Sequence, residues 1–211
     1  MMITLKDKFD KKDITLLPKA EFKGKIFIII SEKESDKAVQ FLLKQKILGI
    51  DTETRPSFRR GQHYKVALLQ VSTHDTCFLF RLNRIGITDS IKKLLEDCNT
   101  IKVGLSLKDD LRSLSERDDF VPGMFIDIQN EVKEIGIQDL SLQKIYANLF
   151  GMKITKNQQL TNWEADALTE AQKTYAATDA WACIQIYEEI KRLKITKDYI
   201  ITKTDNTVTS I

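Results

Sequence analysis

Two pairs of side chains in this chain of 211 residues have the types and spacing needed for chemistry. Asp51 and Glu53 end an apolar segment and are two residues apart, so on a strand both carboxylates point to the same face. Tyr175 and Asp179 are four residues apart, so on a helix they lie one turn apart on the same face.

The first pair indicates a metal site. Adjacent carboxylates on an apolar strand repel each other and lose hydration unless a cation lies between them. Mg²⁺ and Mn²⁺ prefer oxygen ligands, so either ion would suit Asp51 and Glu53. For this pair alone the alternative stays open that both acids lie in solvent just past the end of the strand.

The elements that must position these residues alternate between strand and helix patterns. Residues 47–53 are predicted as a buried strand and residues 168–194 as a long helix. Two strands joined by a short polar segment, 66–71 and 76–80, are typical of a hairpin. The other predicted strands are 25–30, 100–104 and 124–127, and the other predicted helices are 31–45, 88–98, 106–117, 128–135 and 141–150. This order predicts an α/β domain with a mixed sheet.

Composition favours one globular domain, with 42% hydrophobic and 30% charged residues and few glycines and prolines. We expect residues 1–24 to form an N-terminal arm, residues 25–211 the domain, and residues 206–211 a polar tail. The net charge of +3 allows a nucleic-acid partner without demonstrating one. Three scattered cysteines indicate reduced thiols, and no apolar run could span a bilayer, so we expect a cytoplasmic protein without a membrane partner.

Six motifs follow one another along the chain. They are Gly-Ile-Asp-Thr-Glu at 49–53, Lys-Val-Ala-Leu-Leu-Gln at 65–70, Lys-Val-Gly-Leu-Ser-Leu-Lys-Asp-Asp-Leu at 102–111, Asn-Trp-Glu at 162–164, Leu-Thr-Glu-Ala-Gln at 168–172 and Tyr-Ala-Ala-Thr-Asp-Ala at 175–180. This ordered set resembles the DEDDy group of 3′–5′ exonucleases, the family of ribonuclease D and the Werner-protein exonuclease domain. The resemblance extends from about residue 25 to about residue 193 and is specific as a set, although no single motif is. It implies a ribonuclease H-like fold, a mixed β-sheet flanked by helices.

The resemblance also implies the catalytic residues, which are Asp51, Glu53, Asp110, Tyr175 and Asp179. Asp110 is chosen over Asp109 because the family places its acid eight residues after the lysine that begins the Lys-Val-Gly run. The four acids would hold two Mg²⁺ or Mn²⁺ ions, and the tyrosine would orient the attacking water, since a phenol with a pKa near 10 is a poor base at neutral pH. The implied products are nucleoside 5′-monophosphates released from a 3′ end.

Substrate contacts are expected on two loops. Arg55, Arg59, Arg60 and Lys65 follow the first acidic motif and could contact phosphates, or they could form a solvated basic loop. Trp163 could stack on a base, or it could pack where its loop enters the last helix. Asp127 suits a helix N-cap better than a metal ligand.

Several functions compete for this sequence. The basic loop and the strand after it look closer to the Werner-type domain, which favours DNA over RNA as the substrate. The alternatives are a ribonuclease D-like enzyme that trims RNA 3′ ends, a nucleic-acid-binding module of the same fold without catalysis, and an unrelated metal-binding or scaffold protein.

Overall fold

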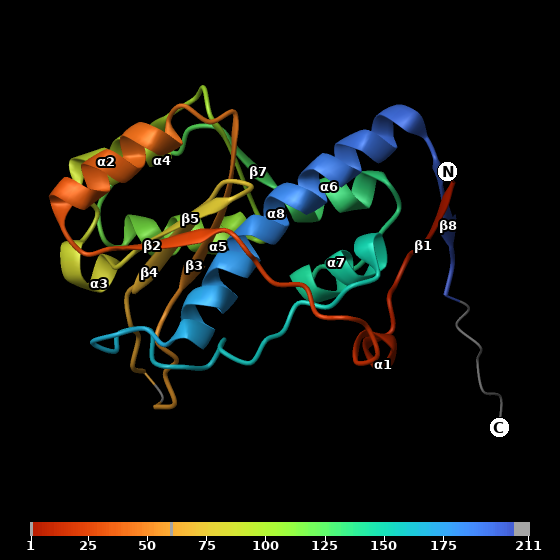
Figure 1. Cartoon of the computed structure of the whole chain (residues 1–211), viewed down its shortest axis with the longest axis horizontal. Coiled ribbons are helices and arrows are strands. Elements are labelled where there is room, and N and C mark those ends of the chain that lie inside the picture. Colours follow the sequence, from red (N-terminus) through yellow and green to blue (C-terminus); the bar gives the residue numbers. More distant parts are fainter. Residues whose placement is uncertain (1, 60, 205–211) are drawn as a thin grey trace.

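The computed structural model describes residues 2–59 and 61–204, so Arg60 and the predicted tail lie outside the described residues. Its centre is a six-stranded mixed sheet (Figure 1) in the order β2-β5-β4-β3-β6-β7. The β3–β4 and β4–β5 pairs are antiparallel and the other three pairs are parallel. The strands are β2 (Lys25–Ile29), β3 (Ile47–Glu53), β4 (Leu68–Ser72), β5 (Thr76–Phe80), β6 (Ile101–Gly104) and β7 (Phe125–Asp127). The predicted α/β class, mixed sheet and hairpin are confirmed.

Helices cover both faces of this sheet. On one face, α2 (Glu32–Leu42), α4 (Asp89–Glu96) and α5 (Leu107–Ser115) bury their apolar residues against the strands. On the other face lies α8 (Glu170–Thr196), which runs across the sheet (Figure 1) and contacts β2, β3, β4, β5 and β6. The remaining helices are α1 (Lys11–Ile14), α3 (Leu82–Ile85), α6 (Ile128–Glu134) and α7 (Leu142–Phe150). Within the described part of the chain, no helix is long and apolar enough to cross a membrane.

The first turn of α8 and its close approach to the sheet both follow from local sequence. Thr169 and Gln172 form a capping box in which each side chain accepts a backbone N–H of the other. Farther along the helix, a Cβ added at Gly49 of β3 would lie 1.8 Å from the carbonyl oxygen of Ala180. Only a residue without a side chain allows this contact, so Gly49 lets α8 lie directly on β3.

A second, two-stranded sheet was not anticipated from the sequence. The strand β1 (Ile3–Lys6) pairs in parallel with β8 (Tyr199–Thr202), and Leu5 is buried in the core that surrounds α8. The side chain of Asn148 on α7 also accepts the N–H of Lys6 at 3.0 Å and donates to its carbonyl oxygen at 2.7 Å. The N-terminal stretch is therefore packed on the domain over these residues.

Candidate active site

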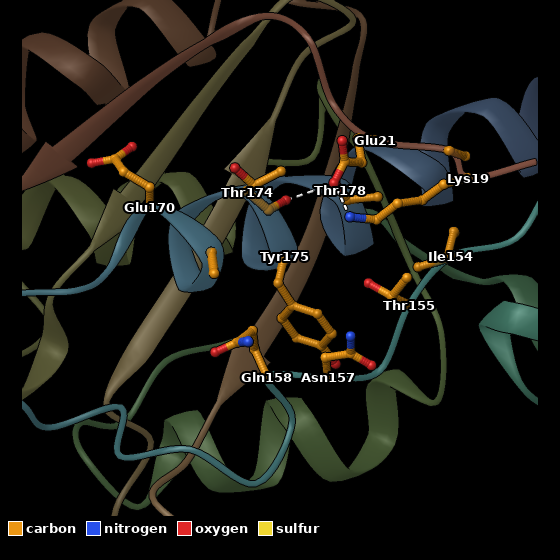
Figure 2. Close-up of a pocket in the computed structure, with 12 residues that line it drawn as sticks. Lys19, Glu21, Ile154, Thr155, Asn157, Gln158, Glu170, Thr174, Tyr175 and Thr178 are labelled. Atoms are coloured by element: carbon orange, nitrogen blue, oxygen red, sulfur yellow. Dashed lines mark hydrogen bonds and ion pairs between the residues drawn. The ribbon is translucent and has the colours of Figure 1, made fainter.

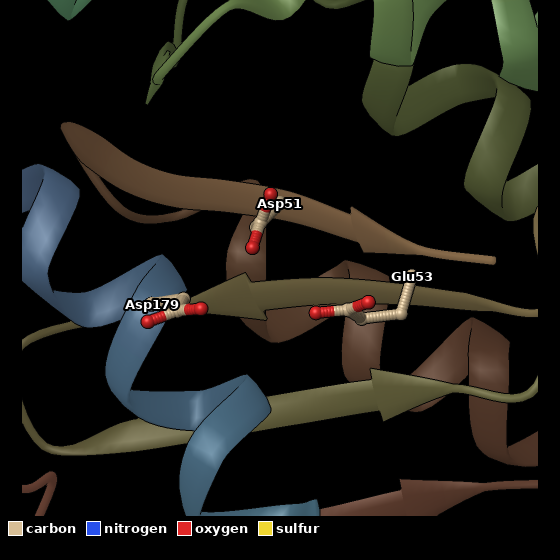
Figure 3. A group of neighbouring side chains, drawn as sticks. All are labelled: Asp51, Glu53 and Asp179. Atoms are coloured by element: carbon tan, nitrogen blue, oxygen red, sulfur yellow. The ribbon is translucent and has the colours of Figure 1, made fainter. Parts of the chain in front are cut away.

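Three acids from two distant parts of the chain meet where β3 lies against α8. The carboxylates of Asp51 and Glu53 extend from β3 and that of Asp179 from α8 (Figure 3). One oxygen atom from each lies within 4.8 Å of the others. The strand pair and the helix acid of the sequence analysis are thus brought together.

Burial and mutual repulsion make these acids resist ionisation. Burial first, and then the neighbouring charges of Asp179 and Asp110, raises the pKa of Glu53 to about 9. Burial also raises the pKa of Asp179 to about 7, and burial followed by three neighbouring acids raises that of Asp51 well above its ordinary value. The atoms that this group could offer to a metal are all carboxylate oxygens, whose negative charges repel one another. The group therefore fits a hard divalent cation.

The fourth acid of the predicted set lies beside this group. Asp110, on the first turn of α5, accepts a hydrogen bond from the hydroxyl of Thr52, which stands between the two acids of β3. Burial raises the pKa of Asp110 to about 6. The side chain of Asp109 is 72% exposed and pairs with Arg112 at 3.5 Å, so it points away from the cluster.

The N-terminus of α5 is fixed by an aspartate from β7. The carboxylate of Asp127 accepts the backbone N–H groups of Ser106 at 3.1 Å and Leu107 at 2.9 Å. It also accepts the N–H of Gln129 at 2.9 Å as the N-cap of α6, which confirms its predicted role. One side chain therefore orients two helices, including the helix that carries Asp110.

Tyr175 lies at the boundary between two hollows. One, of about 360 Å³, contains the three acids and is also lined by Lys156 and Cys183. The other, of about 250 Å³, lies on the side of Lys19 and Glu21 (Figure 2). Burial and the charge of Asp179 raise the pKa of Tyr175 above its ordinary value, so its hydroxyl keeps its proton at neutral pH.

The basic loop after β3 is exposed, and one of its arginines is held in place. The guanidinium of Arg55 lies 3.3 Å from Glu164 and 4.8 Å from the ring centre of Tyr64. Arg59 and Lys65 are exposed to solvent. A hollow of about 430 Å³ separates this loop from Leu160 and the residues after it.

Trp163 is placed in the core rather than on the surface. Its side chain has no exposed area, and its ring lies 6.0 Å from that of Tyr175, centre to centre. The expectation that Trp163 stacks on a base is therefore corrected, because no base could reach the ring in this structure. The packing alternative describes it, since the loop at 160–168 lays this ring under the start of α8.

Comparison with known proteins adds the family. Residues 26–194 match the family model described as 3′–5′ exonuclease. The chain belongs to this family. Among its relatives is an Arabidopsis thaliana 3′–5′ exonuclease, 30% identical over 202 residues, which cover 83% of this chain and 67% of the relative. The Mus musculus bifunctional 3′–5′ exonuclease/ATP-dependent helicase WRN is 28% identical over 188 residues. That match covers 84% of this chain but 13% of the longer mouse protein.

Solved structures of low sequence identity support the fold of this exonuclease family member. The Aedes aegypti Nibbler EXO domain superposes with a TM-score of 0.75 at 18% identity, covering 83% of this chain and 93% of that one. The Escherichia coli RNase D superposes with a TM-score of 0.69 at 21% identity, covering 80% of this chain and 46% of that one. The ribonuclease H-like fold predicted from the motifs is confirmed.

The structure adds three residues to the site of this family member that sequence reasoning did not single out. Thr52 holds Asp110, and Cys183 donates its thiol to the carbonyl oxygen of Asp179 at 3.3 Å. Gln70 pairs with Asp51 in the β3–β4 register, is fully buried, and finds no partner for either amide atom among the described residues. The alternation of the two strands could have indicated Gln70, because directly paired residues share a face.

Proposed function

We propose that this chain is a divalent-metal-dependent 3′–5′ exonuclease of the DEDDy type, which hydrolyses the terminal phosphodiester bond at a nucleic-acid 3′ end. One observation carries the proposal: Asp51, Glu53 and Asp179 offer three carboxylate oxygens within 4.8 Å in a buried cleft. The pKa values of all three are raised, and the charge of Lys156, which lines the same hollow, offsets only part of this effect at Asp179. Membership of the 3′–5′ exonuclease family agrees with a hydrolytic use of this cleft.

In this proposal the four acids hold two ions, Mg²⁺ or Mn²⁺. When bound, such ions supply a hydroxide nucleophile at neutral pH and offset the charge on the leaving 3′ oxygen. Asp51, Glu53 and Asp179 would hold an ion directly, and Asp110, which accepts a hydrogen bond from Thr52 beside them, would complete the set. Attack of water on the terminal phosphorus forms one P–O bond and breaks the bond to the 3′ oxygen. A nucleoside 5′-monophosphate is then released and the shortened strand keeps a 3′ hydroxyl group.

Tyr175 has a positioning part in the same reaction. Its hydroxyl stays protonated because its pKa is raised, so it donates a hydrogen bond and does not act as a general base. It reaches the cleft from the same face of α8 as Asp179, one turn away. The tyrosine therefore orients the attacking water by a donated hydrogen bond.

The basic loop contains the residues that we propose contact the phosphate backbone. Arg55 lies two residues after Glu53, and its guanidinium is held in a fixed orientation by Glu164 and Tyr64. Arg59 and Lys65 extend the positive charge along the loop, and Arg60 completes the proposed set. Phosphate contacts of this kind are independent of sequence, which suits an enzyme that removes every nucleotide in turn.

DNA is the proposed substrate, and RNA is the alternative. A relative from Aquifex aeolicus named DNA polymerase I supports DNA, whereas relatives named ribonuclease D support RNA. The neighbouring structures include a Trypanosoma brucei RNase D in complex with RNA. A direct comparison of substrates is therefore the decisive experiment.

That experiment follows 5′-labelled oligonucleotides with Mg²⁺ or Mn²⁺, using single-stranded DNA, 3′-recessed duplex DNA and single-stranded RNA. The expected result is a ladder that shortens from the 3′ end, fastest on DNA, and disappears with EDTA or in Asp51→Asn. Faster degradation of RNA would assign the ribonuclease D-like alternative. Binding to the oligonucleotides without any ladder, in protein that is still stabilised by metal, would assign the non-catalytic binding module.

A further inference from the structure

β2 is an apolar strand at the end of the sheet, and its outer side pairs with no other strand among the described residues. β2 is the terminal strand of the six-stranded sheet, and its only neighbour there is β5. The side chain of Phe27 is 47% exposed, and Ile30, just after the strand, is 53% exposed. An edge strand presents unpaired N–H and C=O groups, which form a template for pairing with another chain.

The hydrogen-bonding pattern identifies which backbone groups face outward. The N–H of Lys25 donates to Asp75, and the carbonyl oxygen of Ile29 accepts from Arg81, so the odd-numbered residues of the strand face β5. Because backbone groups alternate along a strand, the N–H and C=O groups of Ile26 and Ile28 face the free edge. Two residues therefore present two donors and two acceptors at the edge.

We propose that a second copy of this chain occupies the edge, with the two β2 strands antiparallel about a two-fold axis at Phe27. This register sets Ile26 of each copy opposite Ile28 of the other, so all the outward groups are used in four hydrogen bonds. A register centred one residue away would pair Ile26 with Ile30, whose N–H is already bonded to Glu34 at 3.0 Å. Two six-stranded sheets then become one continuous sheet.

The side chains next to the edge can pack against the same side chains of a second copy related by this two-fold axis. Phe27 packs on Phe78 at 5.5 Å, and Phe41 of α2 reaches the same ring at 5.6 Å. These rings line a groove of about 510 Å³ between β2 and α2, whose apolar surface a second copy would cover with its own Phe27. Directly opposed residues of antiparallel strands have Cβ atoms ~5 Å apart, so the two Phe27 rings would meet.

Charge agrees with this arrangement. Lys25 begins the strand, and the carboxylate of Glu34 lies at its other end, where it accepts the N–H groups of Ile30 and Ser31. Antiparallel pairing brings the two ends together, so Lys25 of each copy approaches Glu34 of the other on the α2 side of the sheet. Both residues line the groove, which puts them in the same layer.

The test compares wild-type protein with Phe27→Lys and Ile200→Lys by sedimentation velocity across the micromolar range. Ile200, on β8, is 48% exposed and is therefore a matched apolar edge residue outside the proposed contact. The wild type and Ile200→Lys are expected at twice the 24.3 kDa mass of one chain, and Phe27→Lys at the mass of a single chain. A wild type that is monomeric throughout, or a dimer that Phe27→Lys leaves intact, overturns the proposal.

A cross-linking experiment tests the register with a covalent bond, which also traps a dimer weakened by the loss of the Phe27 ring. Cys98 is exposed while Cys77 and Cys183 are buried, so Cys98→Ser gives a background without an accessible thiol among the described cysteines. In that background Phe27→Cys is expected to form a disulfide-linked dimer on mild oxidation, because the two-fold axis opposes residue 27 to itself. Equal cross-linking of Phe27→Cys and Ile200→Cys would show random collision and overturn the register.

Discussion

Neutralising one acid of the cluster is expected to stabilise the metal-free fold, and Asp179→Asn is the variant that shows it best. The pKa of Asp179 is raised from 3.8 to about 7, so the folded chain binds this proton more tightly than the unfolded chain does. A raised carboxyl pKa means that stability falls as the pH rises from the unfolded value toward the folded one. At pH 8 the fold bears the full free-energy cost of ionising Asp179, whereas at pH 5 it bears less than half of that cost.

The magnitude follows from the size of the shift. About three pKa units at ~1.4 kcal/mol each give an upper limit of ~4 kcal/mol at pH 8. The neighbouring acids share the repulsion, so removing one charge relieves part of it, and ~2 kcal/mol is expected. For a chain of this size that is a rise in Tm of ~4–8 °C for Asp179→Asn at pH 8 in EDTA.

The assay is thermal unfolding at pH 5 and pH 8, with EDTA and with Mg²⁺ or Mn²⁺. Asp109→Asn is the control, because Asp109 is a neighbouring acid whose side chain is largely exposed and whose charge has only a lesser effect on Asp110, so a much smaller change is expected from it at either pH. Metal should raise the Tm of the wild type and leave Asp179→Asn unchanged. A variant that melts below the wild type at pH 8 in EDTA, or gains equally at both pH values, would refute the electrostatic reasoning.

Three further predictions concern the surroundings of the cluster. Thr52→Val removes the hydrogen bond to Asp110 and should lower the exonuclease rate by ~10-fold. It should also lower the free energy of unfolding by ~1 kcal/mol in a denaturant titration. An unchanged rate would mean that this hydrogen bond has no part in catalysis. Tyr175→Phe should keep the metal-dependent rise in Tm but lose activity by ~10²-fold, and loss of both would make the tyrosine structural. Gly49→Ala places a methyl group against the carbonyl oxygen of Ala180 and should cost ~3 kcal/mol or more in urea unfolding, whereas a neutral result would mean that α8 can shift freely.

The sequence predicted the central elements well because their signals are local. The strand at 47–53 is observed over the same residues, and the hairpin strand at 76–80 likewise. Both are short apolar runs between polar residues, which is the pattern of a buried strand. The long helix begins at Glu170, two residues later than predicted, because Thr169 is its cap.

The strand and the residue roles that the sequence did not predict depend on contacts between residues far apart in the chain. β1 is only four residues long and alternates apolar with polar side chains, and it is a strand because β8 lies beside it, nearly 200 residues away in the chain. The roles of Thr52 and Gln70 likewise depend on what the fold brings to them and not on their own neighbours in the sequence. Spacing alone could not place Asp110 beside the other acids, and the family resemblance was needed to choose it over Asp109.

The pairing of β1 with β8 also determines how the domain responds to mechanical force. The two strands are parallel, with Ile3 beside Tyr199 and Lys6 beside Thr202. A pull outward from the start of β1 and from the end of β8 acts along the strands in opposite directions. The hydrogen bonds between them would then be sheared together and not opened one at a time. This small sheet would therefore resist tension as a unit, and the domain behind it would carry load only after that sheet had failed.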